Sequence, residues 1–268
     1  MSARAGNLLL CVTGFAIATV GAMCGIGGGV FAVPLLHYGR KLELKRAVAT
    51  ALVLVLSTSA FSTVAECLRH TPSLHTGIVL AAMGGVVLGT ELGYRVSERI
   101  SVGALRGVFF FVLLAVAVRL VWSAGSNALG EDPALWLGTQ AYLRAAGAGI
   151  AGGFIAPLLG LGGGLLMVPL LFFGIPGMGF AEARATSLAS GTLAAVRSLW
   201  LHMRAGRVDT SAVQPLALGA IGGAFAGVYL VHLEGVVQVA KVLLAVIMVL
   251  VALRFLQDIY RARERARA

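Results

Sequence analysis

Two clusters of consecutive glycines are the residues of this sequence best suited to bind an anion. Each cluster interrupts an apolar segment and opens the next one: Gly27, Gly28 and Gly29, and again Gly162, Gly163 and Gly164. A helix that begins there has N-terminal amides without intrahelical partners and about half a positive charge at that end. Because glycine lacks a side chain, an anion can approach these amides directly. Pro34 and Pro169 add a second interruption to each helix.

The alternative interpretation of the glycine clusters is that they only allow helices to pack closely. A nucleotide-binding loop is not indicated, because no strand is predicted before either cluster. Neither cluster ends in Lys followed by Ser or Thr, as a phosphate-binding loop would.

A polar stripe lies on the apolar segment 183–203. At about 100° per residue, Thr186, Ser190 and Arg197 fall within about 40° of one another on a helix. Arg197 lies well inside the segment, where an ionisable group needs a partner, a cavity or a substrate. We interpret it as an unpaired cation that attracts an anion. Two alternatives stay open: the hydroxyls bond to the preceding turn, and Arg197 extends to the cytoplasmic end of the helix.

The acidic residues and the potential metal ligands indicate no catalytic centre. Glu66 and Glu91 lie near segment ends with basic residues three or four positions later, which predicts surface ion pairs, with proton coupling as the alternative. The five histidines show no ligand spacing, and the three cysteines form no C-x-x-C motif. We therefore expect no metal, no cofactor and no enzyme activity.

The elements that carry these residues are predicted to lie in a membrane. Hydrophobic residues make up 59% of the 268 and charged residues only 12%, against about 25% charged residues in soluble domains. The net charge of +10 would suggest nucleic acid in a soluble chain, but here the Lys and Arg residues lie mainly in short loops and a tail beside apolar segments. The charge therefore indicates membrane topology, and we expect the lipid bilayer rather than nucleic acid as a partner.

The apolar segments form two sets of five. They run over residues 8–24, 30–38, 47–68, 76–94 and 102–122, then 141–159, 165–175, 183–203, 212–232 and 236–257. Residues 25–36 match residues 160–171 at eight of twelve positions, which indicates duplication. The second segment of each set is too short to cross a bilayer, so each set contains a helix broken by glycines or a re-entrant hairpin.

The placement of Lys and Arg predicts how the two sets are oriented. The basic tail, residues 258–268, lies in the cytoplasm with the N-terminus, and the linker 123–140, which has no Lys or Arg, lies outside. The first repeat is then 1–122 and the second 141–257. Each crosses the membrane an odd number of times, so the repeats are inverted.

We expect an all-α integral membrane fold of two inverted repeats, each with about five helical segments. The expected count is eight full spans plus broken or re-entrant pieces, or ten helical segments if each is counted separately. Arg69 and Arg184 are exceptions to the charge rule that gives this orientation. Inverted repeats with discontinuous helices are a recurring transporter architecture, in which the substrate site lies near the bilayer midplane.

The paired motifs G-x-G-G-G-x-x-x-V-P-L-L, each followed by A-x-A-T-A/S-L, resemble those of the TauE/SafE sulfite exporter family. The second copy has the Thr-Ser pair as Thr186 and Ser187, whereas the first has Thr50 followed by Ala51. The resemblance covers nearly the whole chain. It implies transport of sulfite or of small organosulfur anions such as sulfoacetate across a bacterial inner membrane.

Together, these features predict a carrier that moves a small anion by alternating access. An anion channel of the same architecture is the first alternative, and a membrane-embedded enzyme or scaffold the second. Coupling to protons or other ions and homo-oligomerisation stay open. The predicted substrate-binding residues are Gly27, Gly28, Gly29, Pro34, Thr50, Gly162, Gly163, Gly164, Pro169, Thr186, Ser187, Ser190 and Arg197.

Overall fold

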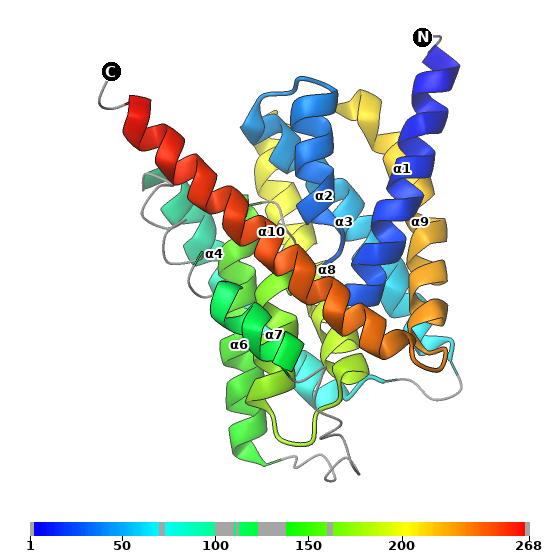
Figure 1. Ribbon diagram of the computed structural model, residues 1–268, viewed down its shortest axis with the longest axis vertical. Helices are drawn as coiled ribbons and strands as arrows, with labels where there is room; N and C mark the ends of the chain where they lie inside the picture. Colours follow the sequence, from blue (N-terminus) through cyan, green and yellow to red (C-terminus); the bar gives the residue numbers. More distant parts are fainter. Residues whose placement is uncertain are drawn as a thin grey trace.

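The computed structural model describes residues 3–69, 73–99, 110, 113–122, 138–159 and 163–265, and all regular elements within these ranges are helices (Figure 1). They are α1 (Ala3–Cys24), α2 (Gly29–Pro34) with the π-helical turn Leu35–Gly39, α3 (Leu44–Cys67), α4 (Thr76–Arg99), α6 (Thr139–Leu159), α7 (Gly164–Gly174), α8 (Phe180–Arg204), α9 (Thr210–Val231) and α10 (Val236–Arg265). Leu113–Trp122 is also helical. Residues 123–137 of the predicted linker and most of 102–112 lie outside the described residues.

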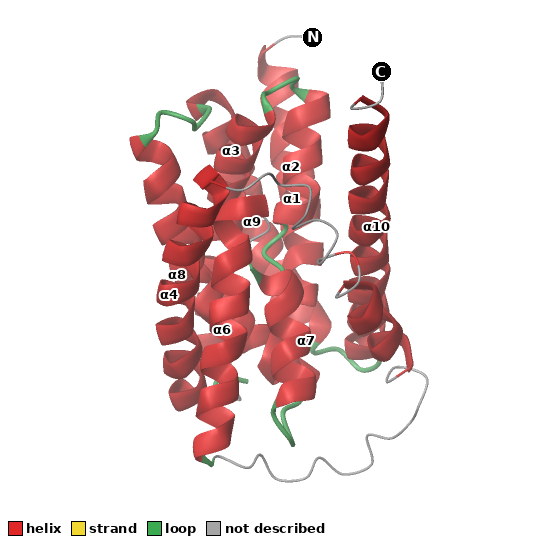
Figure 2. Cartoon of the chain, turned by 90° about the vertical axis from the view of Figure 1, so that its left-hand side faces the viewer, coloured by secondary structure: helices red, strands yellow, loops and turns green. Residues whose placement is uncertain are grey.

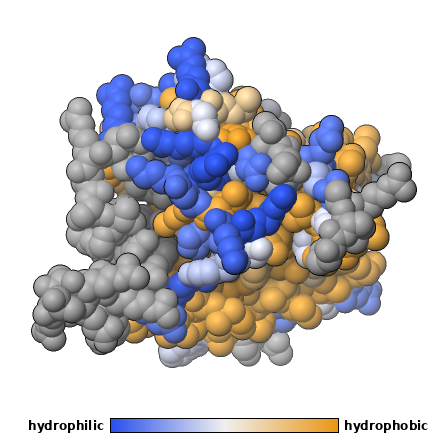
Figure 3. Space-filling view, turned by 90° about the horizontal axis from the view of Figure 1, so that it is seen from above, coloured by the Kyte–Doolittle hydropathy of each residue, from blue (hydrophilic) through white to orange (hydrophobic). Residues whose placement is uncertain are grey.

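The helices have the lengths and surfaces of a membrane bundle, which confirms the predicted class. Within the described residues, five helices are long and apolar enough to cross a bilayer, namely α1, α3, α4, α9 and α10. At 1.5 Å per residue, α6 and α8, with 21 and 25 residues, also reach the roughly 30 Å of a hydrocarbon core. Large apolar side chains stay exposed on the bundle, and Figure 3 shows them flanking a hydrophilic end. A lipid environment accounts for such a surface.

The first helices of the two halves, α1 and α6, run in opposite directions. In Figure 1, α1 descends from the N-terminus at the top, and in Figure 2, α6 begins at the bottom of the molecule. Equivalent helices of the two halves also make equivalent contacts. Helix α1 packs on α9 and α6 packs on α4, while α3 packs on α9 and α8 packs on α4. The halves therefore interlock instead of forming two separate bundles.

Glycines at every fourth position allow the closest of these contacts. A Cβ on Gly85, Gly89 or Gly93 of α4 would fall within 2.0–2.2 Å of a carbonyl oxygen of α6. In the same way, a Cβ on Gly219, Gly223 or Gly227 of α9 would fall within 2.0–2.4 Å of a carbonyl oxygen of α1. The hydrophobic effect contributes little to association between helices in lipid. Small residues at a helix interface instead allow close backbone packing, which stabilises the contact.

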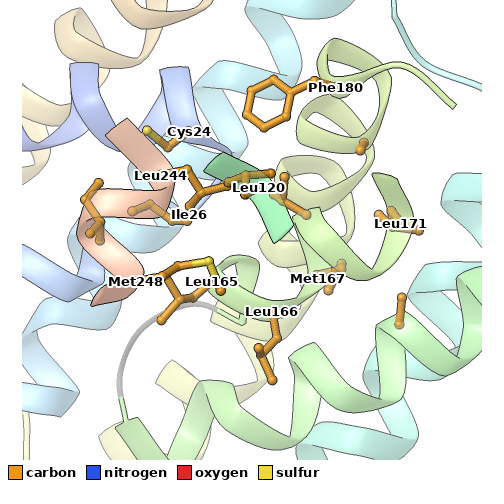
Figure 4. Packing of buried hydrophobic residues seen from close by; sticks show 14 of the residues in the cluster. Cys24, Ile26, Leu120, Leu165, Leu166, Met167, Leu171, Phe180, Leu244 and Met248 are labelled. Atoms are coloured by element: carbon orange, nitrogen blue, oxygen red, sulfur yellow. The ribbon is translucent and has the colours of Figure 1, made fainter. Parts of the chain in front are cut away.

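The centre of the bundle is filled with apolar side chains around the first glycine loop. Figure 4 shows Cys24 and Ile26 in the same cluster as Leu165 of α7, Met248 of α10 and Leu120. Because these side chains come from both halves, the loop before α2 and the start of α7 are fixed by one shared core.

Candidate functional site

Both glycine loops place a helix N-terminus inside the protein. Gly28 precedes α2 with a φ of 82°, and Gly163 precedes α7 with a φ of 76°. Residues other than glycine rarely adopt this left-handed backbone conformation. Neither first turn is capped by a side chain of the N-cap residue. Two helix ends with electropositive backbone therefore start within the bundle, as the sequence predicted.

The two loops touch each other. A Cβ on Gly164 would lie 2.2 Å from the carbonyl oxygen of Gly25 and 2.8 Å from the Cα of Ile26, so only glycine fits there. Ser187 of α8 donates a hydrogen bond of 2.9 Å to the same Gly25 oxygen. The first turn of α7, the loop before α2 and the middle of α8 therefore meet at one point between the halves.

The other predicted glycines pack tightly against neighbouring elements. A Cβ on Gly163 would lie 2.3 Å from the oxygen of Gly152, and one on Gly28 would lie 2.8 Å from the Cγ2 of Ile17. Gly27 faces Val55 at 3.0 Å. Gly163 thus meets backbone, whereas Gly27 and Gly28 meet side chains first and adopt positive φ values of 68° and 82°, which favour glycine. Gly162 lies outside the described residues.

The two motif prolines have different local effects. After Pro34 the helix widens into the π-helical turn Leu35–Gly39. Pro169 is buried inside α7, which continues to Gly174. The second interruption predicted from proline is therefore visible in the first half, whereas α7 stays helical through its proline.

The predicted hydroxyl residues divide into bonded and unbonded ones. Ser190 donates to the carbonyl oxygen of Thr186 at 2.6 Å, and Thr50 donates to that of Arg46 at 2.8 Å, so both make the back-bond to the preceding turn. Thr50 also accepts from the amide of Asp209 at 3.0 Å, which places it at the start of α9. The buried Thr186 hydroxyl has no hydrogen-bond partner among the described residues. It is the one predicted hydroxyl with capacity left for a ligand within that part of the chain.

Arg197 is not the unpaired cation that the sequence suggested. Its Nη2 lies 2.9 Å from Oε2 of Glu91 on α4, and its guanidinium also lies over the ring of Trp200. The side chain is 40% exposed. Helical periodicity cannot reveal this partner, because Glu91 lies 106 residues away. Glu91 also pairs with Arg95 at 3.1 Å, so its predicted surface ion pair is confirmed.

Glu66 is buried: the predicted ion pair with Arg69 is present, but its predicted surface position is wrong, because the Glu66 side chain is 1% exposed. Its Oε2 accepts a hydrogen bond of 2.7 Å from Nη2 of Arg184 on α8, and the two side chains are 1% and 0% exposed. Arg184 also donates to the carbonyl oxygen of Ala22 at 3.2 Å. The pair thus joins α3 of the first half to α8 of the second and to the end of α1.

Further polar groups surround the second oxygen of Glu66. Oε1 accepts from the amide of Ser73 at 3.1 Å and lies 3.7 Å from Nη1 of Arg69 and 3.6 Å from Nε2 of His232. Burial lowers the pKa of His232 below its ordinary value, which favours the neutral imidazole. We call Glu66, Arg69, Ser73, Arg184 and His232 the Glu66 cluster. It forms where α3 and α9 end, at Cys67 and Val231, and Figure 1 shows these helix ends on the side of the bundle away from the two termini.

The sequence did not predict the Glu66 cluster, although the positions of two arginines pointed to it. Arg69 and Arg184 both break the positive charge rule at the same predicted level of the membrane. The structure explains this exception, because a buried carboxylate faces both guanidinium groups. An acidic residue and two misplaced basic residues at one level could have indicated a polar cluster shared by the two halves.

The interlocked halves, the two broken helices and the buried polar cluster define a polytopic membrane protein with the architecture of a transporter. Comparison with known families makes the assignment specific. The model of the family "Sulfite exporter TauE/SafE" matches residues 1–120 and 145–268, so the chain belongs to this family.

Individual relatives are named as membrane transporters. The chain is 27% identical to the probable membrane transporter protein YunE of Bacillus subtilis, over 80% of this chain and 84% of the relative. It is 26% identical to the probable membrane transporter protein MJ0441 of Methanocaldococcus jannaschii, over 61% of this chain and 60% of the relative. The chain matches only 20% of the length of MamO of Paramagnetospirillum magneticum, at 28% identity. No solved structure matches the chain. The protein is thus a multi-pass membrane transporter of the TauE/SafE family.

Proposed function

We propose that the protein carries small anions, sulfite or organosulfur anions such as sulfoacetate, by alternating access between the two sides of a bacterial inner membrane. The family description supports a sulfur oxyanion as the substrate. In this proposal both termini are cytoplasmic, the repeats are inverted, and the chain transports its substrate without chemical conversion.

The observation that carries the choice of an anion is the meeting of the two glycine loops. The uncapped first turn of α7 begins at Gly164 directly against Gly25 of the other loop. The first amides of a helix have no intrahelical partner, and the helix dipole favours negative charge there. Thr186, with its unbonded and buried hydroxyl, lies one residue from Ser187, which already bonds to the Gly25 oxygen. The proposed binding site therefore comprises the glycine loops and Thr186. Ser187 and Ser190 belong to it as neighbours that already donate to the oxygens of Gly25 and Thr186.

Arg197 has no place in this site. Its guanidinium is bound to Glu91 and is 40% exposed, so an anion there would compete with a carboxylate that already holds the cation. The proposed site therefore does not include Arg197, which the sequence suggested as the cation that attracts the anion.

Transport into proteoliposomes tests the proposal. The substrates are sulfite, sulfate, thiosulfate, sulfoacetate and a small carboxylate, each with and without a proton gradient. A carrier shows flux that saturates with substrate concentration and counterflow exchange, whereas a channel of the same build shows neither. Absence of uptake for every anion in vesicles that contain folded protein would contradict the proposed substrate class.

A further inference from the structure

The Glu66 cluster contains more cationic donors than it has acceptors for. Arg184 uses Nη2 for Glu66 and Nη1 for Ala22, and its buried Nε has no hydrogen-bond partner among the described residues. In the same part of the chain, the buried Nη1 of Arg69 also lacks a hydrogen-bond partner. Two guanidinium groups thus face one carboxylate, and the cluster carries a surplus of positive charge and of N–H donors.

Such a surplus is costly in a membrane protein unless a further acceptor completes it. A fully buried guanidinium needs a partner that satisfies its donors as well as its charge. The oxygens of a carboxylate, a sulfonate and a sulfite ion match the planar fork of arginine in the same way, through two parallel hydrogen bonds. The missing acceptor has the chemistry of a small oxyanion.

The cluster lies directly beside the crossing of the glycine loops. A Cβ on Gly25 would fall 3.0 Å from Cγ of Arg184, and the oxygen of Gly25 is the atom that Gly164 approaches. Arg184 also donates to Ala22, two residues before the end of α1. The aliphatic part of the Arg184 side chain therefore packs against the first glycine loop, and its guanidinium group lies where the two halves meet.

We propose that the Glu66 cluster is a binding site for the transported oxyanion. The anion's oxygens accept from the Nε of Arg184, which has no partner among the described residues, and replace the Glu66 carboxylate at its Nη2. This inference rests on the proposed function and assigns Arg184 as the cation that contacts the substrate. When the anion binds, the hydrogen bond between Arg184 and Glu66 breaks and one between Arg184 and an anion oxygen forms. The released carboxylate takes up one proton from water.

The exchange links anion binding to protons. The charged and titratable groups that face Glu66 are Arg184 from α8, Arg69 after α3 and His232 after α9. Only Glu66 must change its charge for the anion to enter, so one proton accompanies each anion, and affinity rises as the pH falls. Protonation of His232 at lower pH would add positive charge in the same direction.

Binding measurements on the purified full chain test this assignment. The probes are sulfate, thiosulfate and sulfoacetate, which keep their charge between about pH 6 and pH 8, and calorimetry in buffers of different ionisation enthalpy counts the protons taken up. The variants are Glu66→Gln, Arg184→Gln and Arg184→Lys. Glu91→Gln is the matched control, because Glu91 also pairs with an arginine of α8 but has a side chain that is 35% exposed.

We expect the parent protein to take up about one proton per bound anion and Glu66→Gln to take up none. Glu66→Gln should also bind about tenfold more tightly near pH 8, because no charge-assisted hydrogen bond must first be broken. Arg184→Gln should bind at least about tenfold more weakly, Arg184→Lys should be intermediate, and Glu91→Gln should match the parent.

Unchanged or weaker binding by Glu66→Gln, or parental affinity in Arg184→Lys, would overturn the assignment. The conservative lysine variant serves if Arg184→Gln does not fold. If the parent binds an anion and the cluster variants do not alter that binding, this inference fails while the proposed function stands. If the parent binds none of the probes and transports no anion in vesicles, both fail.

Discussion

Replacement of Gly85 by alanine tests the interlocking of the two halves, and replacement of its neighbour Gly84 provides the control. A Cβ on Gly85 would fall 2.0 Å from the carbonyl oxygen of Ala146 and 2.9 Å from the amide nitrogen of Ile150, whereas a Cβ on Gly84 meets nothing within 4 Å. Ordinary contact begins at 3.4 Å. Because both obstructing atoms are backbone, no rotamer change relieves the clash, and α4 must move away from α6 by more than an ångström.

The size of the effect follows from two opposing contributions. Over-packing of a close contact costs about 1–3 kcal/mol, and a backbone obstacle places Gly85 at the upper end of that range. Alanine returns about 0.5–1 kcal/mol through its helix propensity. Gly85→Ala should therefore lower the free energy of unfolding by about 2 kcal/mol, while Gly84→Ala should raise it by up to about 1 kcal/mol.

Thermal unfolding of the two variants in the same detergent measures this difference. For a chain of this size, 1 kcal/mol corresponds to roughly 2–4 °C in Tm, so Gly85→Ala should melt about 4–8 °C below the parent. Gly223→Ala in α9 should behave similarly, because its Cβ would fall 2.2 Å from the oxygen of Phe15 in α1. Equal stability of Gly85→Ala and Gly84→Ala would refute the close approach of α4 and α6.

Three further predictions concern polar residues. Thr186→Val removes a buried hydroxyl that has no described partner, so stability should not fall. The KM for transport should rise about tenfold if the hydroxyl binds the anion. An unchanged KM would remove Thr186 from the site. Arg197→Gln breaks an exposed pair with Glu91 and should change stability by less than about 1 kcal/mol; a large loss of transport at limiting substrate would restore Arg197 to the site. Since the pKa of His232 is lowered by burial, the unfolded chain binds more protons below about pH 6.5, and stability should fall as the pH drops through that value. Parallel melts near pH 7.5 and pH 5.5 should show a smaller loss for His232→Gln than for the parent.

The helices could be predicted because the bilayer imposes its thickness on the sequence. The predicted segment 165–175 corresponds to α7 at Gly164–Gly174, and the predicted break before it falls at the glycines. Apolar runs and glycine interruptions are local signals. The repeated motif then located corresponding elements in both halves without any knowledge of their contacts.

The partners of the charged residues could not be predicted in the same way. Glu66 has a basic residue three positions later, and helical spacing therefore suggested a surface pair. Its closest partner is Arg184, 118 residues away, and the pair is buried. Local spacing identifies residues on one helix face, but only the packing of α3 against α8 decides which charge lies opposite.

The packing of the two halves is symmetric, but the charges on it are not. In the aligned motif, Arg184 corresponds to Val48, and at the same separation Glu66 corresponds to His202. Close glycine contacts, by contrast, occur in both halves, between α4 and α6 and between α9 and α1. If the protein alternates between two states as proposed, an exchange of equivalent packing gives neither side of the membrane a preference. Any preference for direction must then come from the asymmetric groups, and the buried pair of Arg184 with Glu66 joins the halves at one end only, with an exposed pair of Arg197 with Glu91 further along α8.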